Sequence, residues 1–466
     1  MIEKTDILYV HPTKLLSNTK YAIIPVGLIG LLNLLIQKGY RVLGINNGVE
    51  KFLNPNYELE NELKTIDYKV LIIDLHWYEH AYGAVAAANL SKKMYPQRPV
   101  IIGGLTTTVY ASEILANFPA VDYAVKGDGE KPLMMLVDYL VKQEGHLNHI
   151  PNLCFRDNEK VVNKEITYIS HKIDALDYVS VDFLKNKIFN YNLYKFGINL
   201  TKTAALYMAR GCQYNCSFCS GSNKNSPVFF GEKNRFTFRS PQAVFHDLDR
   251  LYRKGVRLFQ PTHGFQMLDD TYYQELFAMI RSKKYDIGIL VPCCQLPSHE
   301  FLMDLKKTFN KEMTYVLIAP YTGDEEVRKL NDGRQFTNNE LLDLLKFMSG
   351  NKIKARLFYA QNVHNENPHS FDLTIRQVEE AAAFYPHDFL SVICERIYLE
   401  PLAPIIDEGI DSRINSFMDC YHYCQKDDES DPGYSDNSTP YLDERLKRFT
   451  NLRNQLRLSD DFLDFA

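Results

Sequence analysis

Short hydrophobic runs alternate with longer amphipathic stretches along the first 145 residues. The apolar runs lie at residues 7–10, 41–45, 70–74, 99–104 and 123–125. Helical stretches lie between and after them, including residues 25–36, which end before Gly39, and residues 133–141. Continuous apolar strands separated by helices indicate a parallel sheet that is covered on both faces. We therefore predict an α/β, doubly wound (Rossmann-like) domain over residues 1–145.

A second alternating series begins near residue 203. Its strand candidates lie at residues 205–208, 258–260, 287–291, 315–319, 355–359 and 391–393 with 396–399. Helical stretches separate them, at residues 241–254, 271–282, 298–308, 339–349 and 373–384. Six such units predict a partial TIM-type (β/α)6 barrel over residues 201–405, with its chemistry at the carboxyl ends of the strands.

Residues 146–200 and 406–466 show a weaker alternation of apolar and polar positions. Residues 146–200 contain a polar stretch at 157–165, and we expect them to form a connector between the two domains. Residues 406–466 are expected to be a C-terminal helical extension, with a mobile loop at 426–438 and a final helix at 441–456.

The composition and charge of the chain argue against some classes of function. The chain has 466 residues, 45% of them hydrophobic and 24% charged, as in soluble proteins of two or three domains. The net charge is −5 and no lysine- or arginine-rich block occurs, so we expect no nucleic-acid partner. No apolar run approaches the roughly 18–20 residues that span a bilayer. The charged N-terminus is unlike a signal peptide, which predicts a cytoplasmic protein without a membrane span.

Three cysteines, Cys212, Cys216 and Cys219, lie just after the first predicted barrel strand. Thiolates are the ligands of iron–sulfur clusters, and three of them leave one iron of a four-iron cluster open. A structural zinc site takes four ligands, and the next cysteines lie far downstream. The total of nine cysteines is odd, which argues against a disulfide framework. The loop therefore predicts a four-iron–four-sulfur cluster, with zinc as the alternative.

The Cys-x3-Cys-x2-Cys spacing, with Phe218 before the last cysteine, resembles the signature of the radical S-adenosylmethionine (SAM) superfamily. In that family the open iron binds the amino and carboxylate groups of SAM. An electron from the cluster then cleaves SAM to methionine and a 5′-deoxyadenosyl radical. The resemblance implies that Phe218 packs against the adenine of SAM, and Gly211 permits a tight turn before the first ligand.

The resemblance also suggests where further SAM contacts lie. The candidates are Thr262, His263 and Gln266 after the second barrel strand, Thr322 after the fourth, and Arg356 in the fifth. Arg356 has the alternative role of pairing with a nearby carboxylate. A polar set follows the fifth strand and is expected to face the substrate: Gln361, Asn362, His364, Asn365 and Glu366.

The N-terminal domain resembles the cobalamin-binding domain that precedes many radical SAM barrels. The matching segments are residues 25–28, the Gly103-Gly104 turn with Thr106 to Thr108, and Asp122 with residues 127–130. Gly103 and Gly104 would let the backbone approach a macrocycle. The hydroxyls of Thr106 to Thr108 and the helix N-terminus beside them would suit a tail phosphate.

One motif of cobalamin domains is missing. Domains that bind cobalt through histidine carry Asp-x-His-x-x-Gly after their first strand, whereas this chain has residues 11–14, His-Pro-Thr-Lys, there. Asp74 and His76 reproduce the Asp-x-His start, but they follow a different strand and lack the glycine. His76 belongs to a polar–aromatic cluster with Trp77, His80 and Tyr82 at the carboxyl end of this strand, and it is a candidate ligand-facing residue. A domain that kept the fold and lost the cofactor is the alternative.

The other cysteines bear on the type of reaction. Cys293, Cys294 and Cys394 lie at or near predicted strand ends, where a thiol can donate a hydrogen atom to a substrate radical. Buried cysteine is more often a small hydrophobic residue. Cys420 and Cys424 are spaced as on one helix face, and we expect them to be packing residues.

The sequence therefore predicts a radical SAM enzyme that abstracts hydrogen from a substrate carbon, most simply on the way to cobalamin-dependent methyl transfer. Cobalamin-independent epimerisation, dehydration or rearrangement of a natural-product or peptide precursor stays open, as does a non-catalytic iron–sulfur or zinc protein. The expected partners are a small-molecule or peptide substrate and an electron donor such as flavodoxin or ferredoxin.

Overall fold

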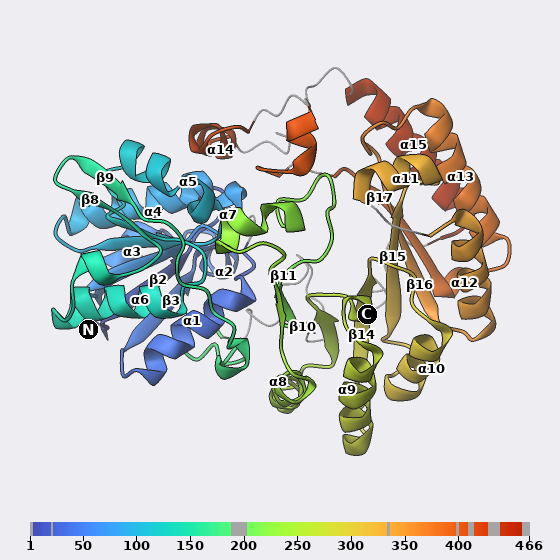
Figure 1. Ribbon diagram of the computed structural model, residues 1–466, viewed down its shortest axis with the longest axis horizontal. Coiled ribbons are helices and arrows are strands. Elements are labelled where there is room, and N and C mark those ends of the chain that lie inside the picture. Colours follow the sequence, from blue (N-terminus) through green and yellow to red (C-terminus); the bar gives the residue numbers. More distant parts are fainter. Residues whose placement is uncertain are drawn as a thin grey trace. The chain divides into compact units, whose positions relative to one another are not determined.

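The computed structural model describes residues 3–19, 22–187, 203–332, 336–397, 400–408, 414–426 and 439–458. The chain divides into two compact units (Figure 1). The N-terminal unit comprises Met1–Leu193, Asn223–Thr237 and Arg413–Pro432. The barrel unit comprises Tyr194–Ser222, Phe238–Ser412 and Gly433–Ala466. Each unit therefore contains segments that are distant in the sequence, and the predicted domain limits do not describe this interleaving.

The N-terminal unit is built on a seven-stranded sheet in the order β3-β2-β5-β6-β7-β8-β9. The strands are β2 (Ile7–His11), β3 (Val42–Asn46), β5 (Val70–Asp74), β6 (Val100–Gly103), β7 (Tyr123–Val125), β8 (Leu153–Asp157) and β9 (Lys160–Asn163). The pairs from β3 to β7 are parallel, and β8 and β9 add an antiparallel hairpin. The short strands β1 (Glu3–Lys4) and β4 (Ile66–Asp67) form a separate parallel pair.

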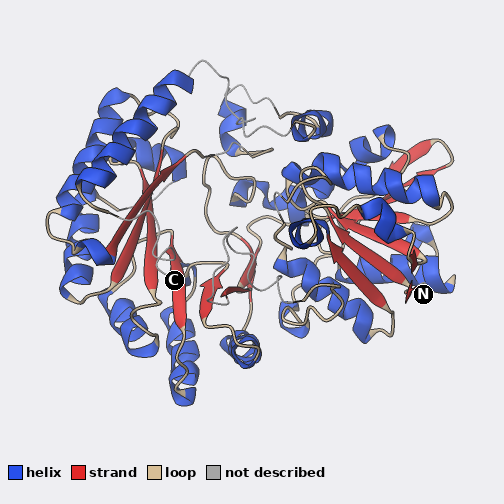
Figure 2. Ribbon diagram, turned by 180° about the vertical axis from the view of Figure 1, so that it is seen from behind, coloured by secondary structure: helices blue, strands red, loops and turns tan. Residues whose placement is uncertain are grey.

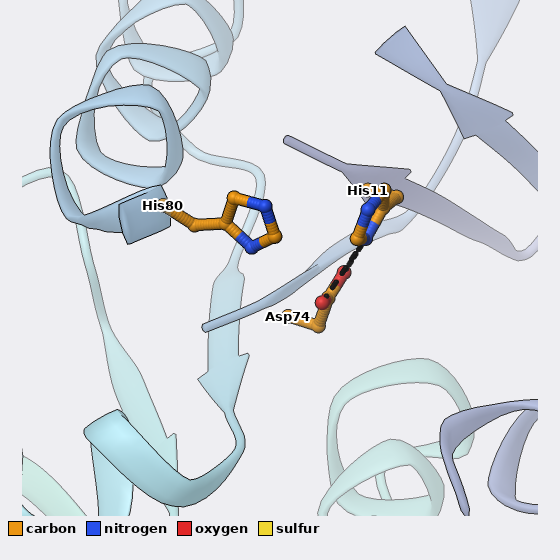
Figure 3. A group of neighbouring side chains, drawn as sticks. All are labelled: His11, Asp74 and His80. Carbon is orange, nitrogen blue, oxygen red and sulfur yellow. Dashed lines mark hydrogen bonds and ion pairs between the residues drawn. The ribbon is translucent and has the colours of Figure 1, made fainter. Parts of the chain in front are cut away.

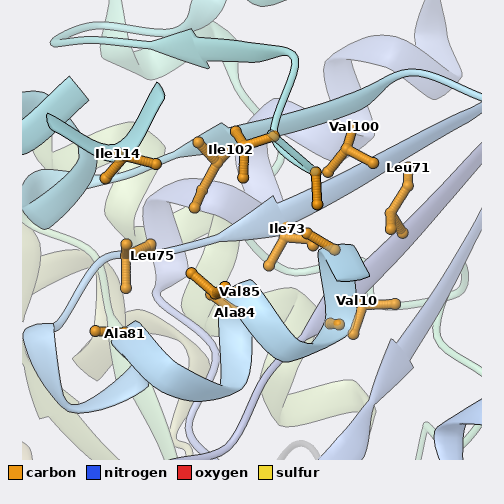
Figure 4. Packing of buried hydrophobic residues seen from close by; sticks show 14 of the residues in the cluster. Val10, Leu71, Ile73, Leu75, Ala81, Ala84, Val85, Val100, Ile102 and Ile114 are labelled. Carbon is orange, nitrogen blue, oxygen red and sulfur yellow. The ribbon is translucent and has the colours of Figure 1, made fainter. Parts of the chain in front are cut away.

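Helices cover both faces of this sheet, as the continuous apolar strands predicted (Figure 2). They are α1 (Val26–Gln37), α2 (Asn47–Leu53), α3 (Leu59–Leu63), α4 (Ala81–Met94), α5 (Leu105–Asn117) and α6 (Glu130–Val137). In β2, Leu8 and Val10 face one core and Ile7 and Tyr9 face the other. The first core lies under α4 and α5 (Figure 4). Burial of each such aliphatic side chain stabilises the folded state by roughly 1.5–3 kcal/mol relative to leaving it exposed.

Part of the predicted connector belongs to the sheet instead. Residues 153–163 form the β8–β9 hairpin, which extends the sheet beyond β7. Leu153, Cys154 and Phe155 are buried in the cores of the unit. A run of three apolar residues beside a polar stretch is too short to show a strand period, so the tertiary contacts decided this element.

A segment from near the C-terminus completes the helical layer of the N-terminal unit. Helix α14 (Phe417–Cys424) packs on α4 and α5, and the Phe417 and Phe118 rings meet edge to face at 5.5 Å. The Glu113 carboxylate accepts the Phe417 and Met418 N–H groups, which places an anion at the helix N-terminus. Cys420 and Cys424 are fully buried in the core, which confirms the packing role predicted for them.

The barrel unit contains a six-stranded parallel sheet in the order β10-β13-β14-β15-β16-β17. The strands are β10 (Thr203–Leu206), β13 (Leu258–Pro261), β14 (Gly288–Cys293), β15 (Tyr315–Tyr321), β16 (Lys354–Ala360) and β17 (Leu390–Glu395). Helices follow the strands: α8 (Pro241–Arg253), α9 (Asp270–Lys283), α10 (His299–Thr308), α11 (Glu325–Asp332), α12 (Asn338–Gly350) and α13 (Pro368–Ala382). The order runs from β10 to β17 without closing in the described residues, which confirms the predicted partial barrel.

The ends of the barrel unit differ in detail from the prediction. The final helix, α15 (Thr439–Gln455), is present and packs near β17 and α13. Helix α11 was not predicted, because it is short and its sequence is mostly polar. The predicted strand at 396–399 is absent at residues 396–397, and residues 398–399 and the loop at 427–438 lie outside the described residues. No helix in the described ranges is long and apolar enough to cross a membrane.

The docking of α14 gives a testable prediction. Replacement of Phe417 by alanine removes a fully buried ring, which typically costs about 3–5 kcal/mol. We expect a lower thermal unfolding midpoint and faster hydrogen exchange in α4 and α5. The matched control is Phe52→Ala, since Phe52 is 51% exposed in the same unit. Equal effects of the two substitutions would show that α14 adds nothing to the stability of this unit.

Candidate active site

The three cysteines of the predicted cluster lie together in one half-buried loop of the barrel unit. The loop follows the short strand β11 (Ala209–Gly211), and Gly211 has a φ of 86°, a left-handed conformation that favours glycine. Burial raises the pKa of the Cys219 thiol well above its usual value, and the Glu400 carboxylate, Cys216 and Cys212 add to the effect. Clustered, partly desolvated thiolates need a positive charge, which bound iron would supply. The donor set therefore fits the cluster.

Hydrogen bonds fix the middle of this loop at Ser217. Its N–H donates to the Asn331 carbonyl oxygen at 2.6 Å, and its hydroxyl donates to Asn331 Oδ1 at 3.1 Å. From the other side, the Ile405 N–H donates to the Ser217 carbonyl at 2.9 Å. Asn331 lies in α11 and donates through Nδ2 to the carbonyls of Val327 and His364. The loop is thus held between α11 and the segment that follows β17.

A second contact fixes the end of the loop. Glu400 Oε2 accepts the Ser220 N–H at 2.7 Å, and the Ser220 hydroxyl donates to the Pro401 carbonyl. These bonds lie one residue beyond the last cysteine. Neither Asn331 nor Ile405 was a candidate in the sequence, because neither belongs to a motif and both lie far from residues 212–219 in the chain.

Two residues predicted to contact SAM also position the start of the loop. His263 Nε2 lies 2.9 Å from the Gly211 carbonyl oxygen, and Thr262 Oγ1 accepts the Met208 N–H at 3.0 Å. Burial lowers the pKa of His263, so its imidazole is neutral near pH 7 and Nε2 carries the proton that it donates. Gln266 Nε2 donates to Cys293 Sγ at 3.2 Å and links the ends of β13 and β14. Their contacts with SAM stay a prediction.

Phe218 belongs to an apolar cluster at the carboxyl end of the barrel. Its ring meets Tyr321 edge to face, with 5.0 Å between the ring centres. Val327, Val363 and other buried side chains pack against the same pair. This cluster forms a hydrophobic wall beside the cysteine loop, which is compatible with the predicted packing against adenine.

Thr322 and Arg356 have internal partners. Thr322 is fully buried and its hydroxyl donates to Glu366 Oε1 at 2.8 Å. Glu366 also pairs with Arg445, which comes from helix α15 and is 2% exposed. Arg356 Nε donates to Ser391 Oγ at 3.3 Å, and its guanidinium lies 4.8 Å from the centre of the Tyr315 ring. No sequence motif pointed to Arg445, because its position depends on how α15 docks.

The three candidate hydrogen-donor thiols lie at the carboxyl ends of strands. Cys293 and Cys394 are 4% and 7% exposed, and burial raises the pKa of each thiol far above neutrality. Both therefore carry S–H groups at pH 7. Cys294 is half-buried and close enough to Cys212 to raise the pKa of that thiol. Cys294 is therefore the candidate donor that is electrostatically coupled to the cysteine loop.

A surface pocket of about 480 Å³ borders the loop that follows Cys294. Helices α10 and α12 begin at its rim, and its lining mixes polar and apolar side chains. The lining residues are Gln295, Leu296, Pro297, Ser298, His299, Phe336, Glu340, Asp343 and Leu344.

In the N-terminal unit, the candidate cofactor residues lie at the carboxyl ends of β5 and β6. Gly104 has a φ of 124°, and a Cβ there would come within 2.5 Å of the Leu75 carbonyl oxygen. A Cβ on Gly103 would meet only the Val125 oxygen, at 3.5 Å, so the backbone at Gly103 is open to an approaching group. Burial lowers the pKa of His76 to about 4, which leaves a neutral imidazole at pH 7.

The threonines that follow this turn differ in their partners. The Thr106 hydroxyl donates to the His76 carbonyl at 3.1 Å, so this candidate holds the loop after β5. Thr107 is one of the threonines whose hydroxyls were predicted to suit a tail phosphate. Its hydroxyl is fully buried and has no hydrogen-bond partner among the described residues.

Comparison with known families agrees with this geometry. Residues 206–378 match the model of the radical SAM superfamily. Over this region the chain resembles the radical SAM superfamily. The matched region begins at the last residue of β10 and contains the cysteine loop and the strands β13 to β16.

Curated relatives match parts of this chain. An uncharacterized methyltransferase of Pyrococcus horikoshii is 28% identical over 211 residues, which cover 45% of this chain and 40% of the relative. An anaerobic magnesium-protoporphyrin IX monomethyl ester cyclase of Synechocystis is 23% identical over 43% of this chain and 37% of the relative. A hopanoid C-3 methylase of Methylococcus capsulatus is 22% identical over 56% of this chain and 48% of its own length. The chain thus matches less than half the length of these relatives.

Solved structures match nearly the whole chain. The radical SAM methyltransferase TsrM of Kitasatospora setae, with cobalamin and a [4Fe-4S] cluster bound, aligns with a TM-score of 0.67 and 15% identity. The alignment covers 98% of this chain and 89% of TsrM. The cobalamin-dependent radical SAM enzyme OxsB aligns with a TM-score of 0.59 and 12% identity over 98% of this chain and 62% of OxsB. At these identities the likeness concerns the fold.

The contacts of Ser217 predict how the loop keeps its cluster. Asn331→Ala removes the acceptor of the Ser217 hydroxyl and two bonds to neighbouring carbonyls, and buried groups without partners cost roughly 1–3 kcal/mol each. We expect faster loss of iron from the reconstituted protein during anaerobic gel filtration, measured by iron and sulfide content. Asn117→Ala is the control, since the Asn117 side chain is exposed and donates to the Glu113 carbonyl of its own helix. Equal iron retention in the two variants would contradict the proposed role of Asn331.

Proposed function

We propose that this protein cleaves SAM reductively at a four-iron–four-sulfur cluster held by Cys212, Cys216 and Cys219. The observation that carries the proposal is the convergence of three thiols, from one loop, at the carboxyl end of an open parallel barrel. The match to the radical SAM superfamily covers the same loop. We also propose that residues 201–405 form the catalytic barrel, with flavodoxin or ferredoxin as the electron donor.

The bound cluster and SAM would supply an electron and a 5′-deoxyadenosyl group, which leaves as a radical and abstracts hydrogen from a substrate carbon. The protein itself orients and shields these groups. Ser217 and Ser220 fix the loop, and His263 holds the carbonyl just before the first ligand. Phe218 and Tyr321 exclude water from one side of the loop. In this proposal Thr262, Gln266, Thr322 and Arg356 remain candidate SAM contacts.

The radical proposal is tested by product analysis. We expect the reconstituted protein, incubated anaerobically with SAM and dithionite, to form 5′-deoxyadenosine and methionine. Replacing any of the three loop cysteines by alanine should abolish this product, because the cluster would lose a ligand. Cys154→Ala is the control, since Cys154 is fully buried in the other unit. Absence of 5′-deoxyadenosine from a wild-type protein with full iron content would refute the proposal.

We further propose that the N-terminal unit binds cobalamin at the carboxyl edge of its sheet. Ligands of doubly wound sheets bind at this edge. The open backbone at Gly103, the start of α5 at Leu105 and the buried Thr107 hydroxyl fit a large cofactor with a polar tail. His76 and Gly104 shape the same edge. The whole-chain likeness to the cobalamin-bound fold of TsrM supports this proposal.

Bound cobalamin would supply a carrier for a methyl group. Together with hydrogen abstraction this favours methyl transfer to a substrate carbon, and two of the partial relatives are named as methyl-transferring enzymes. A second candidate is a cobalamin-independent radical epimerase or dehydratase. The S–H groups of Cys293 and Cys394 and the position of Cys294 near Cys212 favour it, because a thiol can return hydrogen to a substrate radical.

Cobalamin binding separates the two candidates. We expect hydroxocobalamin, titrated under anaerobic conditions, to bind the wild-type protein and change its visible spectrum. Thr107→Val should weaken binding about fivefold, because a neutral hydrogen bond contributes about 1 kcal/mol. The isosteric control Thr65→Val alters an exposed hydroxyl that donates to the carbonyl of nearby Glu62. No binding by the wild type would refute the methyltransferase, and equal binding by Thr107→Val would refute the role of Thr107.

A further inference from the structure

Two histidines and an aspartate converge beneath the carboxyl edge of the N-terminal sheet. His11 ends β2 and Asp74 ends β5, while His80 lies in a turn just before α4. Their exposed fractions are 0%, 3% and 0%. Figure 3 shows the His80 ring extending toward the His11–Asp74 pair. One donor atom from each residue lies within 4.8 Å of the other two, and the cluster is distinct from the cysteine loop.

The surroundings orient all three side chains. His11 Nδ1 lies 2.9 Å from Asp74 Oδ1 and 3.1 Å from Oδ2. The Tyr9 hydroxyl donates to Asp74 Oδ1 at 2.7 Å, which fixes the carboxylate from the second coordination shell. The His80 ring is packed edge to face against His11 and Trp77, with ring centres 5.0 and 5.8 Å apart. The donors therefore come from three separate elements and are already gathered.

The donor chemistry selects a class of ion. Two imidazoles and one carboxylate form a set that first-row divalent metals such as Zn²⁺ and Fe²⁺ use, whereas Ca²⁺ and Mg²⁺ prefer oxygen ligands. Ligands of one such ion lie about 2.0–2.2 Å from it, so side-chain rotations that move the donors by about 1 Å would close the site. A buried carboxylate is costly without a positive charge, which the ion would provide.

We propose that His11, Asp74 and His80 bind one divalent transition-metal ion, Zn²⁺ or Fe²⁺. The ion would tie β2 and β5 to the start of α4, directly below the edge where we propose cobalamin to bind. Its role is structural, because the donors are almost wholly buried. The inference goes beyond the proposed function, since none of the three residues is assigned to the cluster, SAM or cobalamin.

The test uses the full chain with its iron–sulfur cluster reconstituted, and Zn²⁺ alone as the probe. We expect one Zn²⁺ per chain by elemental analysis after removal of excess metal. Zinc X-ray absorption should show imidazole and oxygen ligands, and no sulfur at about 2.3 Å. His80→Asn should lower the Zn²⁺ affinity at least about 100-fold at unchanged iron content, and His80→Cys should restore it. His149→Ala, which alters an exposed histidine, is the control.

Each result decides the question. The proposal would be overturned if the zinc had sulfur ligands or if His80→Asn bound zinc as tightly as the wild type. It would also be overturned if the wild type bound no zinc. The cluster would then be a buried histidine–aspartate pair with His80 packed against it. The formation of 5′-deoxyadenosine is measured separately and does not depend on this outcome. Repeating the affinity measurement with Fe²⁺ under anaerobic conditions identifies which of the two ions binds more tightly.

Discussion

Hydrogen bonds to Ser217 anchor the cysteine loop, and the chemistry of the barrel depends on that loop. Burial raises the pKa of Cys212 and Cys219 and keeps these thiols protonated. In the proposed site, iron binding would displace these protons, and in a loop that is already ordered the free energy of ligation would not have to order the chain as well. Asn331 and Ile405 provide this preorganisation from two distant parts of the barrel unit.

Local contacts also order the carboxyl edge of the N-terminal sheet. Gly104 turns where a Cβ would strike the Leu75 carbonyl, and Thr106 ties the turn to the loop after β5. The half-buried Gly103 beside it leaves room where a side chain would stand. Beneath it, Asp74 and His11 form a buried polar cluster that would be costly without mutual pairing or a bound cation. Both units thus place polar groups at the carboxyl ends of strands, where parallel sheets bind ligands.

Helices from the C-terminal part of the chain contribute to both units. Helix α14 fills the layer over α4 and α5, and Arg445 of α15 pairs with Glu366 at the carboxyl end of the barrel. Glu366 in turn accepts the hydroxyl of Thr322, so a residue predicted to contact SAM is held by a network that starts in α15. The residues that follow the barrel therefore contribute to the fold of both units.

The sequence by itself indicated the parallel strands of both sheets, many of the helices between them and the three candidate cluster cysteines. Apolar periodicity and a fixed short spacing are local properties, and no distant contact is needed to read them. Only the tertiary structure decided the β8–β9 hairpin, whose apolar run is too short to show a period. It alone placed Asn331 beside Ser217, Arg445 beside Glu366 and His11 beside Asp74. These pairs are separated by at least 63 residues, and packing of whole elements brings them together.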